Sequence, residues 1–160
     1  MKRILIAVDG SEGALKAVAH AAEQIRGQSN LQITLFYVSP GVPPEMWDDG
    51  HILTEEETRE RKAVLDKWLD NQKIKTDSVF RPAIEVLTKA GIDCRQVETK
   101  SLSETVKNTA ECILAEARAG GYETLVLGRC GASRTTHALL GSTVRTILNN
   151  GVGMAVWVAE

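Results

Sequence analysis

The sequence predicts a single Rossmann-like α/β domain over residues 1–160, with a five-stranded parallel sheet covered by helices on both faces. First, short β-branched and aliphatic runs alternate along the chain with amphipathic helical segments, and each crossover helix must pack back on its sheet. Second, the chain shows no internal repeat and no low-complexity tract. Third, a glycine-rich segment from Gly128 to Gly141 separates a predicted strand from a predicted helix, which is where α/β folds hold phosphates.

Composition narrows the class of protein. A chain of 160 residues that is 43% hydrophobic and 25% charged fits one domain with a full core. The net charge of −2 gives no electrostatic reason to expect nucleic acid or an anionic membrane as a partner. The apolar run from Ile4 to Val8 is too short for a signal peptide core or a membrane span, so we expect a cytoplasmic protein. Cys94, Cys112 and Cys130 are widely spaced and odd in number, which indicates reduced thiols and neither a disulfide framework nor a zinc site.

The first half of the chain reads as strand, helix, strand, long loop and helix. The first three elements cover residues 4–9, 12–26 and 32–38, and Gly27 ends the first helix. The proline-containing loop of residues 39–53 is longer than most connectors. It is either a lid, with Trp47 able to stack on a base, or a plain connector. A capping box formed by Thr54 and Glu57 opens the next helix.

The second half of the chain predicts a break followed by three helices that alternate with three strands. Residues 71–78 are polar and favour an interruption of the helix, and proline is best tolerated in a first turn, so we expect a new helix to begin near Pro82 and to end at Gly91. Residues 94–99 have the alternation of a half-exposed strand, and a capping box of Ser101 and Glu104 predicts the helix after it. A strand over residues 123–127, a helix over 142–149 and a last strand over 154–158 follow.

Two features point to a ligand site that holds a phosphate and a neighbouring ribose. Gly128-Arg129-Cys130-Gly131 is followed, after nine residues, by Gly141-Ser142-Thr143, and such glycines let backbone amides and the start of a helix approach a phosphate. Asp9 ends the first strand, so it faces the same cleft if the first and fourth strands are neighbours, and its carboxylate can accept hydrogen bonds from ribose hydroxyls. The alternatives are tight turns without a ligand and, for Asp9, a helix cap, although Ser11 is already a competent cap.

On these residues the chain resembles the universal stress proteins, and in particular their nucleotide-binding branch, which carries G-x-x-G, nine residues and G-[S/T]. The opening strand that ends in Ala7-Val8-Asp9-Gly10-Ser11 is similar too. The resemblance implies an adenine nucleotide alpha hydrolase-like fold and a homodimer that binds ATP, ADP or AMP, with or without Mg²⁺. The nucleotide-binding residues that it implies are Ala7, Asp9, Val38, Leu127, Gly128, Arg129, Gly131, Gly141, Ser142 and Thr143, and a dimer seam would hold Val156, Trp157 and Val158.

The chain departs from the family in its loops. Arg129-Cys130 stands where relatives usually have serine followed by arginine or histidine, and Thr99 to Leu102 takes the place of a glycine-containing loop after the third strand. Cys130 itself is most simply a small filler side chain. His51 beside Asp48 and Asp49 is a weak metal candidate without fixed ligand spacing, and His137 is a surface residue or an approach to a phosphate.

The sequence favours binding over catalysis. It lacks the P-loop run G-x-x-x-x-G-K-[S/T], and no second carboxylate for magnesium is evident, so we expect at most slow hydrolysis and assign no catalytic residue and no metal ligand. The predicted function is an ATP-binding regulatory homodimer of the stress response that acts through unidentified protein partners. A nucleotide-independent dimeric scaffold and a slow ATPase or self-phosphorylating protein are the alternatives.

Overall fold

The computed structural model describes residues 1–47, 50–103, 108–131, 140–150 and 153–160, which contain a five-stranded parallel sheet in the order β3-β2-β1-β4-β5. The strands are β1 (Lys2–Ala7), β2 (Leu31–Ser39), β3 (Val97–Ser103), β4 (Thr124–Gly128) and β5 (Ala155–Ala159). Every pairing between neighbours is parallel. The predicted fold class is confirmed. Because β1 pairs with β2 on one side and β4 on the other, the chain order reverses between β1 and β4, which is where such sheets hold ligands.

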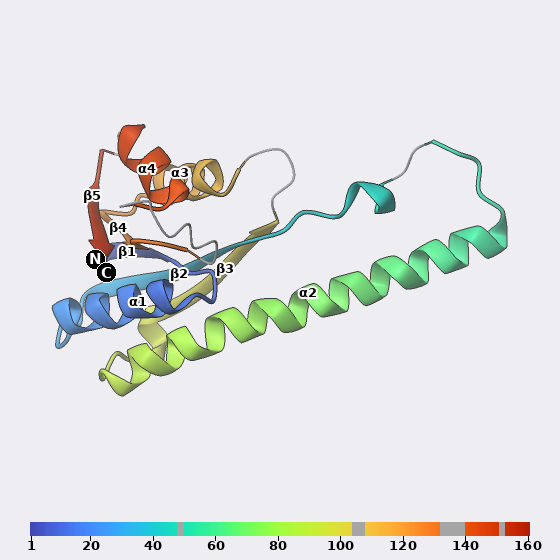
Figure 1. Ribbon diagram of the computed structural model, residues 1–160. Helices are drawn as coiled ribbons and strands as arrows, with labels where there is room; N and C mark the ends of the chain where they lie inside the picture. The colour runs from blue at the N-terminus through green and yellow to red at the C-terminus, as the bar shows by residue number, and fades with distance from the viewer. Residues whose placement is uncertain (48–49, 104–107, 132–139, 151–152) are drawn as a thin grey trace.

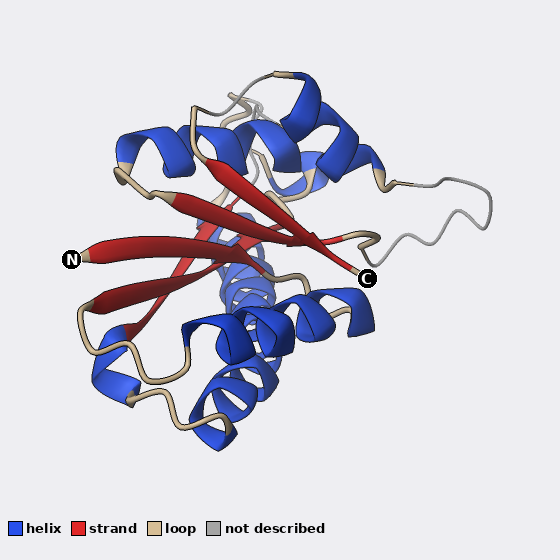
Figure 2. Ribbon diagram, turned by 90° about the vertical axis from the view of Figure 1, so that its left-hand side faces the viewer, coloured by secondary structure: helices blue, strands red, loops and turns tan. Residues whose placement is uncertain are grey.

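Helices lie on both faces of the sheet (Figure 2). The first face carries α1 (Glu12–Ile25) and the end of α2 (Glu55–Lys89), and the second carries α3 (Thr109–Ala119) and α4 (Ser142–Asn149). The side chains of β1 alternate between the two layers, since Ile4 and Ile6 join the core under α1 while Leu5 joins the core under α3 and α4. The sheet is therefore buried on both sides, as its nearly continuous apolar strands require.

Helix α2 is one continuous element of 35 residues, so the predicted break over residues 71–78 and the predicted new helix at Pro82 are both wrong. The polarity of residues 71–78 reflects exposure rather than a turn, because their stretch of α2 projects beyond the sheet (Figure 1). Pro82 lies inside the helix between the buried residues Phe80 and Ala83, and the packing of this region on the core offsets the missing hydrogen bond. The predicted capping box of Thr54 and Glu57 is confirmed by both of its hydrogen bonds.

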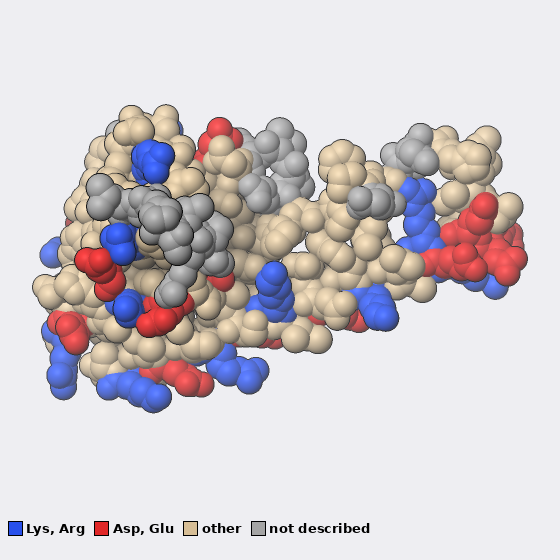
Figure 3. Space-filling view, in the orientation of Figure 1, with Lys and Arg blue, Asp and Glu red and all other residues tan. Residues whose placement is uncertain are grey.

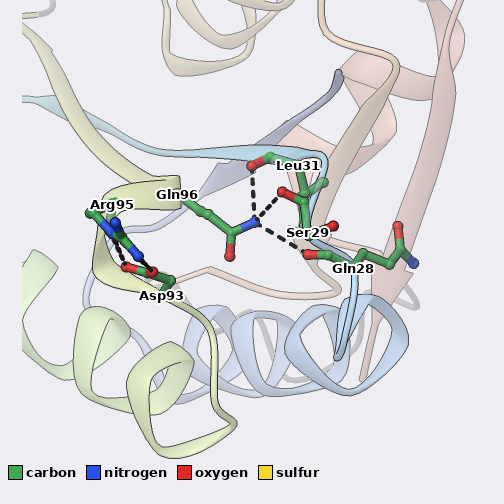
Figure 4. Close-up of polar contacts among 6 residues, drawn as sticks. All are labelled: Gln28, Ser29, Leu31, Asp93, Arg95 and Gln96. Atoms are coloured by element: carbon green, nitrogen blue, oxygen red, sulfur yellow. Dashed lines mark hydrogen bonds and ion pairs between the residues drawn. The ribbon is translucent and has the colours of Figure 1, made fainter.

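The entry to β3 also differs from the prediction. Cys94–Gln96 form a short 3₁₀ helix capped by Asp93, and the Gln96 side-chain amide donates to the carbonyls of Gln28, Ser29 and Leu31 (Figure 4). The Arg95 guanidinium and its backbone amide lower the pKa of Asp93 to about 2. The strand starts three residues later than predicted, and Thr99 to Leu102 belong to β3 rather than to a loop after it.

The capping box predicted at Ser101 and Glu104 is wrong as well. Ser101 lies within β3, and α3 begins only at Thr109, where the Asn108 side chain accepts a hydrogen bond from the Glu111 amide. Glu104 itself lies outside the described residues. An asparagine cap is as competent as serine, so local propensity alone could not choose between the two positions.

Strand β5 forms one edge of the sheet and pairs with β4 alone among the described strands. Val156 and Trp157 are half-buried, and Val158 is 37% exposed. The predicted dimer seam at these residues stays a prediction. Within the described residues, no helix combines the length and the apolar character that a membrane crossing requires.

Candidate functional site

A cavity of about 310 Å³ lies at the carboxyl ends of β1, β2 and β4, beside the first turns of α3 and α4. Its walls come from strands, from helix starts and from the glycine segment. The lining residues are Ala7, Val8, Asp9, Ser11, Ala14, Phe36, Val38, Thr109, Ile113, Leu127, Gly128, Cys130, Gly131, Gly141, Ser142, Thr143 and Val144. Nine of the ten residues predicted for the nucleotide are in this set, so the structure brings them together around one space.

The inner wall of the cavity is apolar. Phe36 is 1% exposed and Leu127 is 3% exposed, and both belong to the core under α3 and α4. Ile113 from α3 is buried and also lines the cavity, while Ala7 and Val38 line it and are only partly buried. A flat apolar group is the natural occupant of this part of the cavity, because burial there removes its surface from water.

Glycines bring three backbone segments into close contact beside this wall. A Cβ atom on Gly128 would lie 2.7 Å from the backbone of Gly13 in α1, and one on Gly13 would lie 2.5 Å from the Cys130 carbonyl oxygen. A Cβ on Gly141 would lie 3.2 Å from the Arg129 carbonyl oxygen, which accepts the Gly141 amide at 2.9 Å. Gly13 and Gly128 leave no space for a side chain, and Gly141 leaves little. These glycines therefore allow residues 128–131 and Gly141, the described parts of the segment, to approach α1 and each other at the cavity.

The start of α4 is the anion-attracting end of the site. Gly141 is its N-cap and has no side chain that could accept from the amides of the first turn, whereas Ser11 caps α1 and Asn108 caps α3 through their side chains. Ser142 and Thr143 line the cavity in that first turn and add hydroxyl donors. The amides, the hydroxyls and the positive end of the helix dipole together favour a phosphate here.

Asp9 lies beside Gly131. Its Oδ1 atom accepts from the Ser11 amide at 2.9 Å and from the Ser11 hydroxyl at 2.5 Å, and its Oδ2 atom would lie 2.8 Å from a Cβ on Gly131. Ser11, rather than Asp9, caps α1 by accepting from the Ala14 amide, as its sequence position indicated. Burial, and to a smaller extent the negative charge of Asp9, raises the pKa of the Tyr37 hydroxyl in the adjacent strand.

Arg129 is the one predicted residue that does not line the cavity. Its guanidinium pairs with the Glu160 carboxylate at 3.1 Å, and its amide donates to the Ala159 carbonyl at 2.7 Å. The side chain therefore ties the start of the glycine segment to the end of β5. Its assignment to the nucleotide stays a prediction.

The structure adds residues to the site that the sequence pattern did not single out. Gly13 lies within a predicted helix, Phe36 reads as an ordinary strand residue, and Thr109 and Ile113 come from a helix whose start was misplaced. A glycine in the first turns of a helix is the one local signal that was available, since it is unfavourable there without a packing reason.

Other candidates lie away from the cavity or outside the described residues. Trp47 does not line the cavity: its indole donates to the Val42 carbonyl, and its own carbonyl accepts from Arg61 of α2. The lid prediction therefore gains no support. Asp48 and Asp49 of the weak metal candidate, and His137, lie outside the described residues. Among the described residues, no group of three or more His, Cys, Asp or Glu side chains is placed to hold a metal ion.

The fold and the site define a parallel α/β protein of the Rossmann-like class with a ligand-sized cavity at its topological switch point. The chain belongs to the universal stress protein family, whose model matches residues 1–152. The comparison with curated proteins gives no match.

Solved structures of universal stress proteins share the fold. The chain is similar to UspA from Lactobacillus plantarum, with a TM-score of 0.70, 19% identity and coverage of 99% of this chain and 97% of that one. A universal stress protein from Archaeoglobus fulgidus has a TM-score of 0.62 and 20% identity, with 100% and 99% of the two chains covered. A universal stress protein in complex with cAMP has a TM-score of 0.65 and 15% identity, with 99% and 97% covered.

Proposed function

We propose that this chain binds an adenine nucleotide, with ATP as the expected ligand, and acts as a regulatory homodimer in the stress response. The observation that carries the proposal is the combination of three chemistries around one cavity: an apolar wall, the Asp9 carboxylate and the start of α4, whose N-cap Gly141 has no side chain. A base, a ribose and a phosphate chain match these three chemistries. The universal stress protein solved with cAMP supports the choice of an adenine nucleotide.

Each part of the nucleotide has a named set of contacts in this proposal. Phe36, Ile113 and Leu127 enclose the base, and Asp9 accepts from ribose hydroxyls while Ser11 fixes the orientation of its carboxylate. The backbone at Gly131 and Gly141 and the hydroxyls of Ser142 and Thr143 surround the phosphates. Any Mg²⁺ would be bound mainly by the phosphate oxygens, since the described residues include no group of three or more His, Cys, Asp or Glu side chains that could hold it.

Most of the binding free energy must come from contacts with the base. A helix terminus contributes only about 0.3–1 kcal/mol to an anion, whereas micromolar affinity requires roughly 8 kcal/mol. Burial of the base against the apolar wall must therefore supply most of the binding free energy. The described site offers no lysine beside the phosphates, so binding rather than turnover is the expected activity.

The test is direct measurement of nucleotide on the purified protein. We expect mass spectrometry of the denatured protein to release adenine nucleotide, and calorimetry of the stripped protein to give micromolar ATP binding near one per chain. GTP serves as the control for the base. In Gly131→Val, the new Cβ atom would lie 2.8 Å from Oδ2 of Asp9, which is too close for an ordinary contact. We expect this variant to stay folded and to lose most of its ATP binding. Equal ATP affinity in the folded variant and the parent, or no nucleotide at all, overturns the proposal.

The homodimer is tested separately at the edge of the sheet. We expect Val158→Lys, at the exposed part of β5, to lower the mass measured by sedimentation, because charged residues on an edge strand oppose pairing. An unchanged mass at all concentrations contradicts a seam at β5.

A further inference from the structure

The start of α4 differs in charge from the starts of the other α-helices. Helices α1, α2 and α3 each have a side chain that caps the first turn and at least one acidic residue in that turn. Figure 3 shows the acidic first turn of α2, Glu55–Glu57, as a negative patch at the far end of that helix. Helix α4 has neither a capping side chain nor an acidic residue in its first turn. Its first turn therefore carries no negative charge that would balance the positive end of the helix dipole.

A cation lies over the start of α4 instead. Arg145 is the only Lys or Arg of this helix, and its Nη2 atom donates to the Leu140 carbonyl, one residue before the N-cap, at 3.4 Å. The side chain thus runs back over the first turn, as side chains in helices do. The guanidinium and the positive end of the dipole repel each other, so this is an unfavourable place for an arginine unless an anion lies there too.

Arg145 lies at the rim of the cavity rather than inside it. It is not among the lining residues, but it follows Ser142 by three positions, and helical residues at this spacing share one face with their Cβ atoms about 5–6 Å apart. Ser142 lines the cavity and is itself exposed, so its side of α4 forms the rim. The guanidinium is therefore placed to meet a phosphate that extends out of the cavity past Ser142.

The cavity itself contains no cation. Asp9 is the one charged side chain among its described lining residues. The amides and hydroxyls at the start of α4 suffice for the phosphate next to the ribose, but further phosphates add charge that calls for a cation. The volume of about 310 Å³ is at the lower end of the range of about 300–1,000 Å³ for ligand pockets, so we expect the outer phosphates of ATP to reach the rim.

Arg145 is free to serve these outer phosphates. Arg129, the other arginine beside the glycines, pairs with the Glu160 carboxylate at 3.1 Å. The described residues give Arg145 no carboxylate partner, and its contact of 3.4 Å with the Leu140 carbonyl is longer than a usual hydrogen bond. Arg145 is also exposed, so its guanidinium can leave Leu140 at little cost and present its fork of donors to a phosphate.

We propose that Arg145 binds the outer phosphates, β and γ, and so makes the site selective for ATP and ADP over AMP. This inference rests on the proposed nucleotide function and adds the residue that reads the length of the phosphate chain. The base, the ribose and the first phosphate are common to all three nucleotides. The difference in affinity among the three therefore reports on the outer phosphates alone.

The first test compares ATP, ADP and AMP by calorimetry in one buffer. We expect the parent to bind ATP more tightly than AMP, and Arg145→Gln to weaken ATP about tenfold while the AMP affinity is unchanged. Arg145→Lys keeps the charge without the fork and should lose less ATP affinity than Arg145→Gln. Arg26→Gln removes the same charge at the opposite end of α1 from the cavity and should bind every nucleotide as the parent does. The fold of α4 is not at risk, because losing a positive charge favours the start of a helix.

The second test uses the dependence on salt. A contact between a guanidinium and a phosphate at the protein surface is screened by salt, so the ATP affinity of the parent should fall as sodium chloride is raised. This fall should be smaller in Arg145→Gln than in Arg26→Gln, which has the same net charge. A role of Arg145 in holding α4 in shape would give the two variants the same dependence.

The outcomes separate this proposal from nucleotide binding itself. If Arg145→Gln leaves ATP affinity unchanged or weakens ATP and AMP equally, or if the parent binds ATP and AMP equally well, the role of Arg145 is refuted and nucleotide binding stands. A parent that binds none of the three nucleotides refutes both.

Discussion

Replacing Gly13 with alanine tests the close packing that shapes the site. Gly13 lies in α1, where alanine is intrinsically favoured over glycine by about 1 kcal/mol. The structure predicts the opposite sign. The added Cβ would lie 2.5 Å from the Cys130 carbonyl oxygen, and ordinary contacts of this kind begin at 3.4 Å, so the two backbones must separate by about 0.9 Å (3.4 minus 2.5).

The cost of that separation falls on both stability and binding. Overpacking of a well-packed interior costs about 1–3 kcal/mol, so after the gain in helix propensity we expect a net loss of roughly 1 kcal/mol in the free energy of unfolding. The displaced residue, Cys130, directly precedes Gly131 at the proposed phosphate contacts. ATP affinity should therefore fall more than stability does.

The assay is chemical denaturation, with calorimetry of ATP binding in parallel. The exposed residue Lys16 of the same helix supplies the reference. The difference in free energy of unfolding between Lys16→Ala and Lys16→Gly measures how much α1 prefers alanine over glycine where no close packing intervenes. The cost of the close approach is this reference value minus the change in free energy of unfolding caused by Gly13→Ala. A Gly13→Ala protein that is stabilised by the full reference value and binds ATP normally would refute the packing argument.

Three further outcomes are expected. Asp9→Asn should weaken ATP binding by about tenfold or more, since a hydrogen bond to a charged group contributes about 1.5–3 kcal/mol. We expect the parent to prefer ribose over deoxyribose nucleotides and Asp9→Asn to lose that preference; equal preference in the two proteins by calorimetry counts against the ribose contact. Burial raises the pKa of Tyr37 in the folded protein above its usual value of 10. The neutral hydroxyl therefore contributes stability below pH 10, and this contribution is lost as the pH rises through the folded pKa. Tyr37→Phe should reduce the fall in the free energy of unfolding above pH 10, measured by chemical denaturation. Pro82→Ala supplies the missing amide inside α2 and should raise the free energy of unfolding, by up to about 3 kcal/mol; a lower value would mean that Pro82 is required by its packing.

The strands other than β3, the glycines beside the cavity and α4 could be predicted because their signals are local. A run of β-branched residues ended by Gly128 marks β4, and α4 spans the residues 142–149 that its apolar spacing indicated. The carboxyl end of a parallel strand has a known location in the fold, so Asp9 could be placed beside the glycines once both strands were recognised.

The errors arose where tertiary packing overrides a local signal. Polar residues 71–78 and Pro82 both favour a break, yet the chain continues as a helix because Val79, Phe80, Ala83 and Leu87 pack on the sheet. Serine and asparagine caps are equally good, so the sequence could not place the start of α3, and with it Thr109 and Ile113 were missed.

Gly13 and helix α2 both show why a local window of sequence is not sufficient. The need for glycine at position 13 exists only because α1 contacts the segment at Cys130, far away in the sequence, so no window around α1 contains the reason for it. The continuity of α2 has its reason outside the local window too: residues 71–78 are polar and exposed or half-buried, and the helix runs through them into Val79, Phe80 and Ala83, which pack on the sheet. A window over residues 71–78 contains none of these packing partners, so it favours a break that the whole fold does not make.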